Sequence, residues 1–580
     1  MCGIFGYLGS RTDAAVITLE ALKKLEYRGY DSWGVAYQVD GGQLFVEKQV
    51  GKIGDAVIQQ KRSSGAAIGH TRWATHGGVT QLNAHPHLDC SGKLAVVHNG
   101  IVENYQALKE ELVTKGHHFI SETDSEVIVH LIEEAAKNLA LKAAASTAFQ
   151  RLEGLNAIVV LEAETQQIVA IKKGSSLVVG KSERGCYLAS DPVALTEHTQ
   201  AGYFLEDDEL ILFADGEISC FNMATDQEKT LTFVQLEISA QAVEKNGFPH
   251  FLLKEIHEQP GVISNFNEDI TEFSRHLQQK IVFVGCGTAY HAGLIGTYLF
   301  AQLKKVAVQA YSGSEFGYWR DLIDAKTTVI FLSQSGETAD IIEHAQFLKK
   351  KGFPIFCLVN RENSSLDRLA DFSIHLSAGP EIAVLATKSF VAKISTLITL
   401  AAGGESAAKD LQASSQALQE ILEPSFIEKY ILPLAHQLST APHIFTIGRG
   451  TSYPIALEAA LKIKEVTYLH TEGFASGELK HGVIALIEPG TPCLVFANDD
   501  ENLKLTLSNA MEMKARGAYI IGVTTQADES FDWHIPVSEC GIASIIPQTV
   551  ISQLLAYHIA VLLGNDPDKP RNLAKSVTVR

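Results

Sequence analysis

Residues 280–290, KIVFVGCGTAY, and residues 443–453, HIFTIGRGTSY, decide the fold, because each joins an apolar run to the same G-x-G-T-x-Y turn. A short apolar run that ends in a glycine-rich turn predicts a buried strand leading into a helix. We therefore expect an internal duplication in the second half of the chain.

Both copies continue in the same way. A second apolar strand and a helix follow in TTVIFLSQSGETADIIEHAQFLKKKG (327–352) and in TPCLVFANDDENLKLTLSNAMEMKARG (491–517). A third strand follows in FPIFCLVN and in AYIIGVTT. Strands that alternate with helices predict two doubly wound parallel α/β domains, which we place at 251–420 and 421–580.

The first half, 2–240, has a different pattern. Strand-like stretches such as KLAVVHNG (93–100) are joined by few helical segments, the first at 13–27, where Asp13 is the expected N-cap. The DGG at 40–42 predicts a hairpin turn. This half is expected to be a mixed α/β domain with paired sheets, and the polar stretch 241–250, QAVEKNGFPH, to be a linker.

Composition excludes several classes of protein. The 580 residues carry a formal net charge of -19 without a basic stretch, so nucleic acid is not an expected partner. The eight cysteines show no CxxC spacing, which predicts neither a disulfide framework nor a zinc site. No signal-peptide pattern or long uninterrupted apolar run is present, so we expect a cytoplasmic protein that does not bind membranes.

The stretch SQSGET (333–338) follows a predicted strand and opens a helix. Backbone N–H groups and the hydroxyls of Ser333, Ser335 and Thr338 would there surround an anion, for which a phosphate monoester is the natural candidate. The alternative is an ordinary capped loop. The second copy carries Asp499, Asp500 and Glu501 instead, which would repel an anion, so one sugar-phosphate site per chain is expected.

Two further stretches have both a structural and a functional interpretation. Glu458, Lys462 and Glu465 share one face of the helix predicted over 457–465, as an exposed ion-pair stripe or as part of a site. The C-terminal DKPRNLAKSVTVR holds Leu573, Val577 and Val579 around Lys575, which suggests a docked tail with an amine able to attack a sugar carbonyl.

Polar residues in the first half are concentrated between its strands. They lie in HTRWATHGG (70–78), NAHPH (83–87), VVHNGIVEN (96–104) and SETDSE (121–126). The histidines lack metal-ligand spacing, so we predict no metal, whereas an oxyanion hole and clamps for a carboxylate and an amine use the same residue types. Cys2, in MCGIFGYLGS, is either a small hydrophobe of an edge strand or a nucleophile.

Together these motifs resemble the family of glutamine-dependent glucosamine-6-phosphate synthases. MCGI is shared with other N-terminal-nucleophile (Ntn) amidotransferases, whereas SQSGET, GELKHG (477–482) and DKPRNLAKSVTV are specific to this family. The resemblance runs along the whole chain. It implies an αββα Ntn glutaminase domain followed by two sugar isomerase (SIS) domains, and no cofactor.

The resemblance also implies a glutamine site in the first half. Removal of Met1 would leave Cys2 as the nucleophile, with its own α-amine, of pKa near ~8, as the base. Trp73 resembles the gate of the family's ammonia channel. Arg28 and Gly29 would lie on the loop that closes the pocket, and the remaining glutamine-binding residues would be Arg72, Thr75, His76, Asn99, Gly100 and Asp124.

A fructose 6-phosphate site is implied in the second half. Lys575 would form a Schiff base with the open ketose, Glu465 would move a proton between C1 and C2, and Lys462 is the neighbour of that base. His481 would open the sugar ring from the adjacent subunit, which implies a homodimer with a shared site. The sugar phosphate would be held by Thr288, Ser333, Gln334, Ser335, Thr338, Val384 and Ala574.

The sequence departs from the family pattern at a few positions. Ala289 replaces a serine that contacts phosphate, and GPEIAVLATKSF (379–390) differs at Pro380, Ala383, Leu385, Ala386 and Ser389. One lost hydrogen bond to a charged group is worth about 1.5–3 kcal/mol. A related aminotransferase or isomerase with another sugar preference, a glutaminase with another acceptor and a sugar-phosphate sensor are therefore the alternatives.

Overall fold

The computed structural model describes all residues except 1, 40–41, 61, 237–243, 264–268 and 579–580. Met1, the first two residues of the predicted DGG turn, the start of the predicted linker and Val579 thus lie outside the described residues. The chain forms two compact units, of which the first comprises 1–244, 337–339 and 574–580 and the second 245–336 and 340–573.

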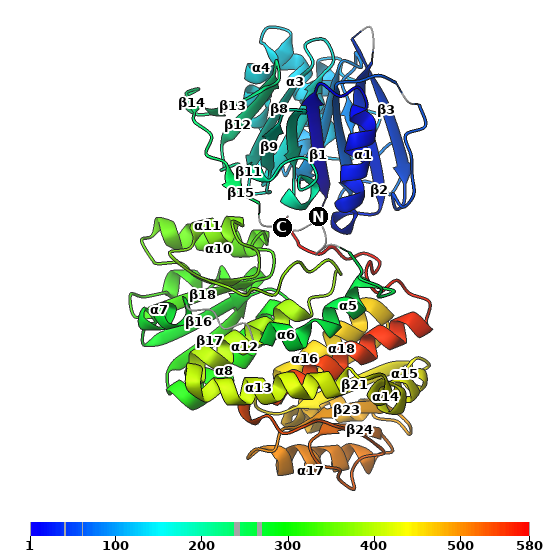
Figure 1. Cartoon of the computed structure of the whole chain (residues 1–580), viewed down its shortest axis with the longest axis vertical. Coiled ribbons are helices and arrows are strands. Elements are labelled where there is room, and N and C mark those ends of the chain that lie inside the picture. The colour runs from blue at the N-terminus through cyan, green and yellow to red at the C-terminus, as the bar shows by residue number, and fades with distance from the viewer. Residues whose placement is uncertain (1, 40–41, 61, 237–243, 264–268, 579–580) are drawn as a thin grey trace. The chain divides into compact units, whose positions relative to one another are not determined.

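Unit 1 contains two antiparallel sheets and a few helices (Figure 1). Its helices are α1 (Ala14–Lys24), α2 (Tyr105–Thr114), α3 (Glu126–Ala136) and α4 (Leu141–Phe149). The first sheet has the order β15-β11-β9-β10-β1-β4-β2-β3 and the second the order β14-β13-β12-β8-β7-β6-β5. The strands are β1 (Gly3–Gly9), β2 (Ser32–Val39), β3 (Gln43–Val50), β4 (Ala66–Arg72), β5 (His87–Leu88), β6 (Leu94–Gly100), β7 (Asn156–Glu162), β8 (Gln167–Lys173), β9 (Val178–Ser182), β10 (Gly185–Ala189), β11 (Ala201–Phe204), β12 (Glu209–Ala214), β13 (Glu217–Asn222), β14 (Glu228–Lys229) and β15 (Val234–Gln235).

Alternation along the strands builds four layers. Successive side chains of a strand point to opposite faces, so Ile4 and Leu8 of β1 pack between the sheets while Phe5 and Tyr7 pack with α1. On the second sheet, Val96 of β6 faces a core that includes α3 and α4. The order helix, sheet, sheet, helix confirms the predicted αββα domain.

Two local predictions in unit 1 have different outcomes. β2 and β3 pair antiparallel with Val39 opposite Gln43, which confirms the predicted hairpin. Asp13 stands at the N-cap position of α1, but its carboxylate pairs with Arg11 at 2.5 Å, so the predicted side-chain cap is not made by any described N–H of that helix. The Asp13 carboxylate therefore pairs with the guanidinium of Arg11 instead of capping the helix.

Unit 2 contains the duplication. The first copy begins after α5 (Phe251–His257), α6 (Gln259–Ile263) and α7 (Asp269–Arg275). It comprises β16 (Lys280–Gly285), α8 (Thr288–Leu299), β17 (Ala307–Ser312), α9 (Gly313–Phe316), β18 (Thr327–Ser333), α10 (Ala339–Lys350), β19 (Phe356–Val359), α11 (Ser365–Leu369), β20 (Phe372–His375), α12 (Lys388–Ala402) and α13 (Gly404–Ile421). The second copy comprises α14 (Pro424–Phe426), α15 (Leu432–Leu438), β21 (His443–Gly448), α16 (Ser452–Thr467), β22 (His470–Ala475), β23 (Pro492–Phe496), α17 (Leu503–Lys514), β24 (Tyr519–Thr524), β25 (Trp533–Pro536) and α18 (Ile545–Leu562).

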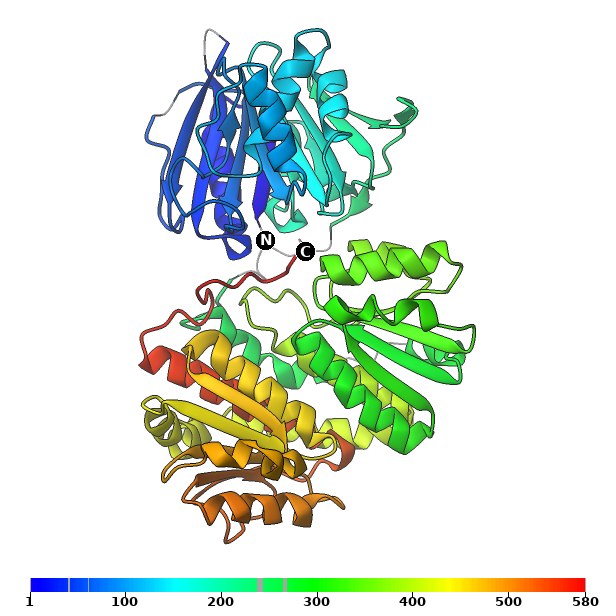
Figure 2. The same ribbon diagram turned by 180° about the vertical axis from the view of Figure 1, so that it is seen from behind.

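The two copies have the same topology. Their sheets, green and yellow to orange in Figure 2, are parallel throughout, with the orders β17-β16-β18-β19-β20 and β22-β21-β23-β24-β25. This confirms the predicted doubly wound domains. In such a sheet the chain reverses its direction of winding between the first and third strands, and ligands bind at their carboxyl ends. The G-x-G-T turn and the SQSGET loop follow β16 and β18, at that point of the first copy.

One hydrophobic core joins the copies, since a single cluster of buried side chains includes Phe283 of β16, Ile444 of β21 and Leu554 of α18. The helical stretch Gly541–Leu562 is long and apolar enough to cross a membrane, but 83% of its most apolar window is buried inside the protein. It is a core helix of unit 2, as α12 also is.

The start and the end of unit 2 are tied together at Asp568. Its carboxylate accepts hydrogen bonds from the backbone N–H of Phe251 (2.9 Å) and of Leu252 (2.8 Å), the first two residues of α5. The backbone oxygen of Asp568 accepts a third, from the N–H of Val384 at 3.1 Å. A charged acceptor at a helix N-terminus satisfies donors that lack a partner within the helix.

Candidate functional site

Cys2 lies immediately before β1, where the thiol meets the end of β4. The backbone N–H of Trp73 donates to its Sγ at 3.2 Å, and Sγ lies 3.6 Å from the Trp73 carbonyl oxygen. Burial raises the pKa of this thiol, although the Trp73 N–H and the charge of Arg72 act in the opposite direction. The group is therefore a thiol at neutral pH and needs a base to become a nucleophile.

Arg28, which was predicted to lie on the loop that closes the pocket, lies between α1 and β2. It ends the 3-10 helix η1 (Glu26–Arg28), is buried, and pairs with the buried Asp191 at 3.2 Å. Its Nε donates to the Cys2 carbonyl oxygen at 3.1 Å. A buried cation needs a paired anion, and Asp191 therefore holds Arg28 behind the nucleophile. Gly29 follows, where an added Cβ would lie 2.7 Å from the backbone of Arg72.

Asn99 and Gly100 end β6 beside Cys2. The Asn99 Nδ2 donates to the Cys2 carbonyl oxygen at 3.0 Å. Gly100 has φ +147°, and an added Cβ would lie 2.3 Å from the Leu155 oxygen, so only glycine fits there. The amide of Asn99, which was predicted to contribute to an oxyanion hole, thus lies beside the backbone of Cys2.

Arg72, at the end of β4, holds the loop that follows it. Its guanidinium donates to the carbonyl oxygens of His76 (2.5 Å), Gly77 (3.2 Å) and Gly78 (3.1 Å). On this loop Trp73 is half-buried, Thr75 is exposed, and the ring of the half-buried His76 meets the edge of Tyr105. The buried Asp124 accepts from the Val102 N–H at 2.8 Å.

Four buried histidines form a cluster beside this site that was not predicted from the sequence. His70 and His85 stack with ring centroids 4.2 Å apart, and His87 and His98 lie close to His85. The Nε2 of His70 lies 3.2 Å from Asn99 Oδ1, so this ring orients the amide. Burial lowers the pKa of His70 to about 3, which keeps the ring neutral. The sequence signal was its position two residues before Arg72, on the same face of β4.

The first four residues of the SQSGET loop, 333–336, belong to unit 2 and are tightly packed. Ser333 Oγ accepts from the Gly336 N–H at 2.9 Å. Gly336 has φ +64°, and an added Cβ would lie 2.0 Å from Ser364 Oγ. Ser333 and Ser335 are buried, whereas Gln334 and Thr338 are half-buried. The loop therefore fixes backbone N–H groups at the switch point of the sheet.

Thr288, at the start of α8, connects the two copies. Its hydroxyl donates to Glu458 Oε1 at 3.0 Å, and His291 Nδ1 lies 2.7 Å from Glu458 Oε2. Burial raises the pKa of Glu458, but Lys462, His291 and Thr288 together hold it below its ordinary value. His291 was not predicted; it lies one turn after Thr288 on the same helix.

The helix face of Glu458 and Lys462 is buried, so the exposed-stripe interpretation is wrong. Lys462 Nζ lies 3.4 Å from Glu458 Oε1 and 2.6 Å from Glu465 Oε2. Burial lowers the pKa of Lys462, but the two carboxylates more than offset this and raise it above its ordinary value. Glu465 is only partly covered and stands at the edge of this charged row.

The remaining predicted residues are spread over several elements. His481 is exposed at the end of the 3-10 helix η7 (Ser476–His481), and Val384 is buried. Ala574 and Lys575 are half-buried. The Val577 side chain is 42% exposed, so it does not dock the tail as predicted; instead its carbonyl oxygen accepts from the Ala339 N–H at 3.1 Å.

Two protein-family profiles match the chain, one in its first half and one in its second half. A profile described as "Glutamine amidotransferase domain" matches residues 54–235. A profile described as "SIS domain" matches twice, at 276–403 and at 437–562. The second match confirms the duplication that the two G-x-G-T-x-Y stretches predicted.

Relatives of known identity match along the whole chain. The isomerizing glutamine–fructose-6-phosphate aminotransferase of Thermococcus kodakarensis is 42% identical over 607 aligned residues, covering 100% of both chains. That of Clostridium tetani is 39% identical over 612 residues, again covering 100% of both. The solved C-terminal domain of the Francisella tularensis glucosamine-fructose-6-phosphate aminotransferase is 31% identical with a TM-score of 0.51, covering 56% of this chain and 99% of that one.

Proposed function

Because the chain belongs to the family of isomerizing glutamine–fructose-6-phosphate aminotransferases, we propose that it converts glutamine and fructose 6-phosphate into glutamate and glucosamine 6-phosphate. The observation that carries this proposal is the similarity to such enzymes over the full length of both chains. This reaction would be the first step in the synthesis of UDP-N-acetylglucosamine.

Glutamine would be hydrolysed in unit 1. Once Met1 is removed, the α-amine of Cys2 takes the thiol proton, and the thiolate attacks the glutamine amide carbon. Asn99 Nδ2 and the Gly100 N–H stabilise the oxyanion, and the amine returns the proton to the leaving ammonia. Water then releases glutamate from the thioester.

Substrate recognition in unit 1 would use charge complementarity. Arg72 binds the α-carboxylate of glutamine, and Asp124 binds the α-ammonium group. Trp73 gates the path of ammonia. The remaining contacts with glutamine are assigned to Arg28, Gly29, Thr75 and His76. The buried position of Arg28 supports an indirect contribution, since it holds the backbone of Cys2.

The sugar would be bound and converted by residues of the second half of the chain. The phosphate is assigned to Thr288, Ser333, Gln334, Ser335 and Thr338, with Val384 and Ala574 against the sugar. Lys575 condenses with C2 of the open ketose and releases water; ammonia then replaces the lysine. Glu465, beside Lys462, takes a proton from C1, a proton is delivered to C2, and the proton of the O1 hydroxyl is transferred to the nitrogen, which gives the aldose amine.

We further propose a cytoplasmic homodimer in which His481 opens the ring of the sugar bound by the neighbouring subunit. The exposure of His481 supports this role. The proposed domains are 2–240, 251–420 and 421–580, with 241–250 as the linker. No cofactor is assigned to the reaction.

The direct test is to incubate the purified protein with glutamine and fructose 6-phosphate and to quantify glutamate and amino sugar. Equal amounts of glutamate and glucosamine 6-phosphate are expected, and glutamate without amino sugar would refute the proposal. A panel of other ketose phosphates tests the alternative sugar preference that Ala289 suggests. A Cys2→Ala variant should lose glutamine hydrolysis and still bind fructose 6-phosphate, and intact-protein mass should show that Met1 is absent.

A further inference from the structure

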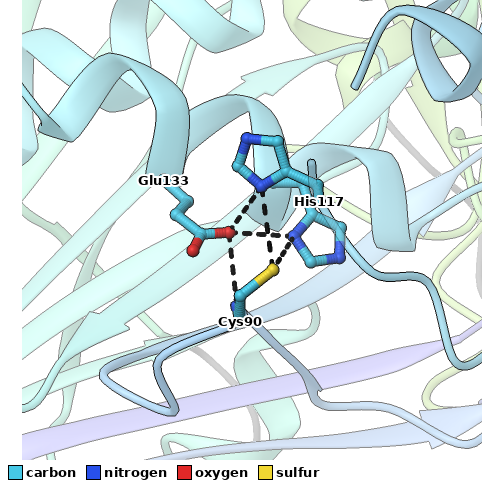
Figure 3. A group of neighbouring side chains, drawn as sticks. Cys90, His117 and Glu133 are labelled. Atoms are coloured by element: carbon cyan, nitrogen blue, oxygen red, sulfur yellow. Dashed lines mark hydrogen bonds and ion pairs between the residues drawn. The ribbon is translucent and has the colours of Figure 1, made fainter. Parts of the chain in front are cut away.

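A second group of chemically reactive side chains lies in unit 1, apart from the glutamine site. Cys90 follows β5, His117 lies between α2 and α3, and His130 and Glu133 lie one turn apart on α3. Figure 3 shows Cys90, His117 and Glu133 pointing toward one another. One donor atom from each of the four residues lies within 4.8 Å of the others.

The spacing of these atoms is close to that of a tetrahedral metal site. Cys90 Sγ lies 3.8 Å from His117 Nδ1 and 3.7 Å from His130 Nδ1. With the usual zinc–ligand bonds, a tetrahedral angle places sulfur and nitrogen about 3.6 Å apart. Glu133 Oε2 lies 2.9 Å from His117 Nδ1 and 3.0 Å from His130 Nδ1, a few tenths of an ångström shorter than around a metal. Since Glu133 is partly exposed, its side chain has room to move outward.

Hydrogen bonding alone explains this arrangement poorly. Three nitrogen atoms converge on the single oxygen Glu133 Oε2: the two histidine Nδ1 atoms and the backbone N of Cys90 at 3.3 Å, so both histidines would have to carry Nδ1–H for all three contacts to be hydrogen bonds. A carboxylate oxygen offers two lone pairs. An ion between the four donor atoms would instead accept a lone pair from each histidine and from the sulfur.

A carboxylate lies within hydrogen-bond distance of the outer nitrogen of His117, and a second carboxylate lies near that of His130 without a hydrogen bond. His117 Nε2 lies 3.0 Å from Glu134 Oε2, and His130 Nε2 lies 3.8 Å from Glu126 Oε1. A metal-bound histidine donates its other N–H to such a group, which fixes the ring and makes the ligand more basic. In both residues it is Nε2 that faces the outer carboxylate, and Nδ1 that faces the cluster.

We propose that Cys90, His117, His130 and Glu133 bind one zinc ion. A thiolate, two imidazoles and a carboxylate are a donor set that suits zinc, whereas calcium and magnesium prefer oxygen ligands alone. Four protein ligands leave no open position, so the ion is structural. It fastens the loop after β5 and the segment before α3 to α3 itself.

The proposed site departs from the expectation that the chain holds no metal. That expectation rested on short ligand spacings along the sequence, and only His130 and Glu133 are close neighbours there. The other two donors arrive from separate segments once the sheet and helices have formed. The histidines of the glutamine site, to which the metal hypothesis was first applied, are not part of this group.

The test measures metal in the full-length protein. Purified chain is incubated with zinc chloride, dialysed against metal-free buffer and analysed by inductively coupled plasma mass spectrometry. One zinc per chain is expected. Cobalt(II) in place of zinc should give the absorption of a tetrahedral site with a sulfur-to-cobalt charge-transfer band, because the spectrum reports geometry and thiolate ligation.

Matched variants separate this site from adventitious binding. Cys90→Ser should lose both the zinc and the charge-transfer band. His118→Asn is the control, because it removes an exposed histidine next to His117 and should keep the metal. Cys2→Ala should also keep it. Zinc that is absent from the wild type, or retained equally by Cys90→Ser, would overturn the proposal.

A second measurement covers the case in which Cys90→Ser does not fold. In the wild type, a thiol reagent followed by peptide mass spectrometry should label Cys90 only after zinc has been removed with a chelator. Equal labelling of Cys90 with and without zinc would likewise contradict ligation by its sulfur. These readouts do not depend on the amino-transfer reaction, so they remain informative if the proposed function is wrong.

Discussion

Lys462 Nζ lies 2.6 Å from Glu465 Oε2, on a helix face where the same ammonium group also lies 3.4 Å from Glu458 Oε1. The inner carboxylate, Glu458, is fully buried, while the outer one, Glu465, is partly accessible. A cation held between two carboxylates keeps the inner one ionised and fixes the outer one in place. The partial exposure of the outer carboxylate agrees with the role proposed for it, proton transfer to and from the substrate.

Replacing Glu465 with glutamine should abolish amino-sugar formation and leave glutamine hydrolysis in place. Loss of a general base costs roughly 10²–10⁴-fold in rate. The measurement is kcat for glucosamine 6-phosphate and for glutamate in the same preparation. Glu472→Gln, which changes an exposed carboxylate on β22, is the control and should behave as the wild type.

Asn99→Ala should lower kcat for glutamine hydrolysis by about 10²–10³-fold, the usual cost of one oxyanion-hole donor. His70→Phe removes the ring nitrogen that orients the Asn99 amide and should lower kcat less, with little change in KM. If His70 acts through Asn99, the double variant will be no slower than Asn99→Ala alone. Additive losses in the double variant would argue for a separate role of His70.

The histidine cluster should make unit 1 sensitive to acid. Unfolded histidine has a pKa of about 6.5, whereas His70 has a pKa of about 3 because of burial. Between these values the unfolded chain binds a proton that the folded chain does not. His70 thus contributes stability that is complete above pH 6.5 and declines by up to about 1.4 kcal/mol per pH unit as the pH falls toward 3.

Hydrogen exchange followed by mass spectrometry provides the measurement. Burial also lowers the pKa of His85, His87 and His98, so the loss should be shared by the strands that carry them. After correction for intrinsic exchange, the amides of β4 and β6 should lose protection as the pH falls from 7.5 to 5. The amides of β18 in unit 2 are the internal control, and an equal loss there would contradict this explanation.

Gly336→Ala should weaken fructose 6-phosphate binding at least about tenfold, because the added Cβ would lie 2.0 Å from Ser364 Oγ and the loop would have to move. Gly352→Ala is the control: its φ is +82°, but an added Cβ meets nothing within 4 Å. That variant carries the backbone strain of about 1–2 kcal/mol without the clash. Calorimetric titration with fructose 6-phosphate measures the affinity of each variant. Equal affinity of Gly336→Ala and Gly352→Ala would exclude the loop as the phosphate site.

Ala289→Ser should lower the KM for fructose 6-phosphate by about tenfold, as expected for one added hydrogen bond to a charged group. Ala289 is half-buried at the second position of α8, beside the predicted phosphate site. Ala301→Ser, at an exposed position beyond that helix, is the control and should leave KM unchanged. An unchanged KM in Ala289→Ser would show that the departure from the family pattern has been compensated elsewhere.

The fold was predictable because its signals are local and repeated. Buried parallel strands appear as apolar runs in the sequence. The G-x-G-T-x-Y turn after β16 recurs after β21. The two-residue alternation in β1 similarly predicts a strand between two layers. Each of these features depends on fewer than about twenty neighbouring residues, which is the range over which periodicity is informative.

The details of both sites could not be predicted from the sequence, because they depend on contacts between residues that are distant in the chain. Asp191 forms an ion pair with Arg28, but the sequence around Arg28 (YRGYDS, 27–32) does not predict that partner. His291 reaches Glu458 from the other copy of the repeat. The cluster of Cys90 with His117 is also assembled only by the folded domain. In each case the residue type was visible, and its partner was not.

The contacts of Asp568 have a consequence for the order in which the protein matures during synthesis. Domains generally fold as units while the chain emerges, the N-terminal ones first. The first turn of α5 takes its capping carboxylate from a residue near the other end of the chain. Residues 251–567 are therefore synthesised before the carboxylate that caps their N-terminal helix, so the first turn of α5 is capped only after the rest of unit 2 has been made.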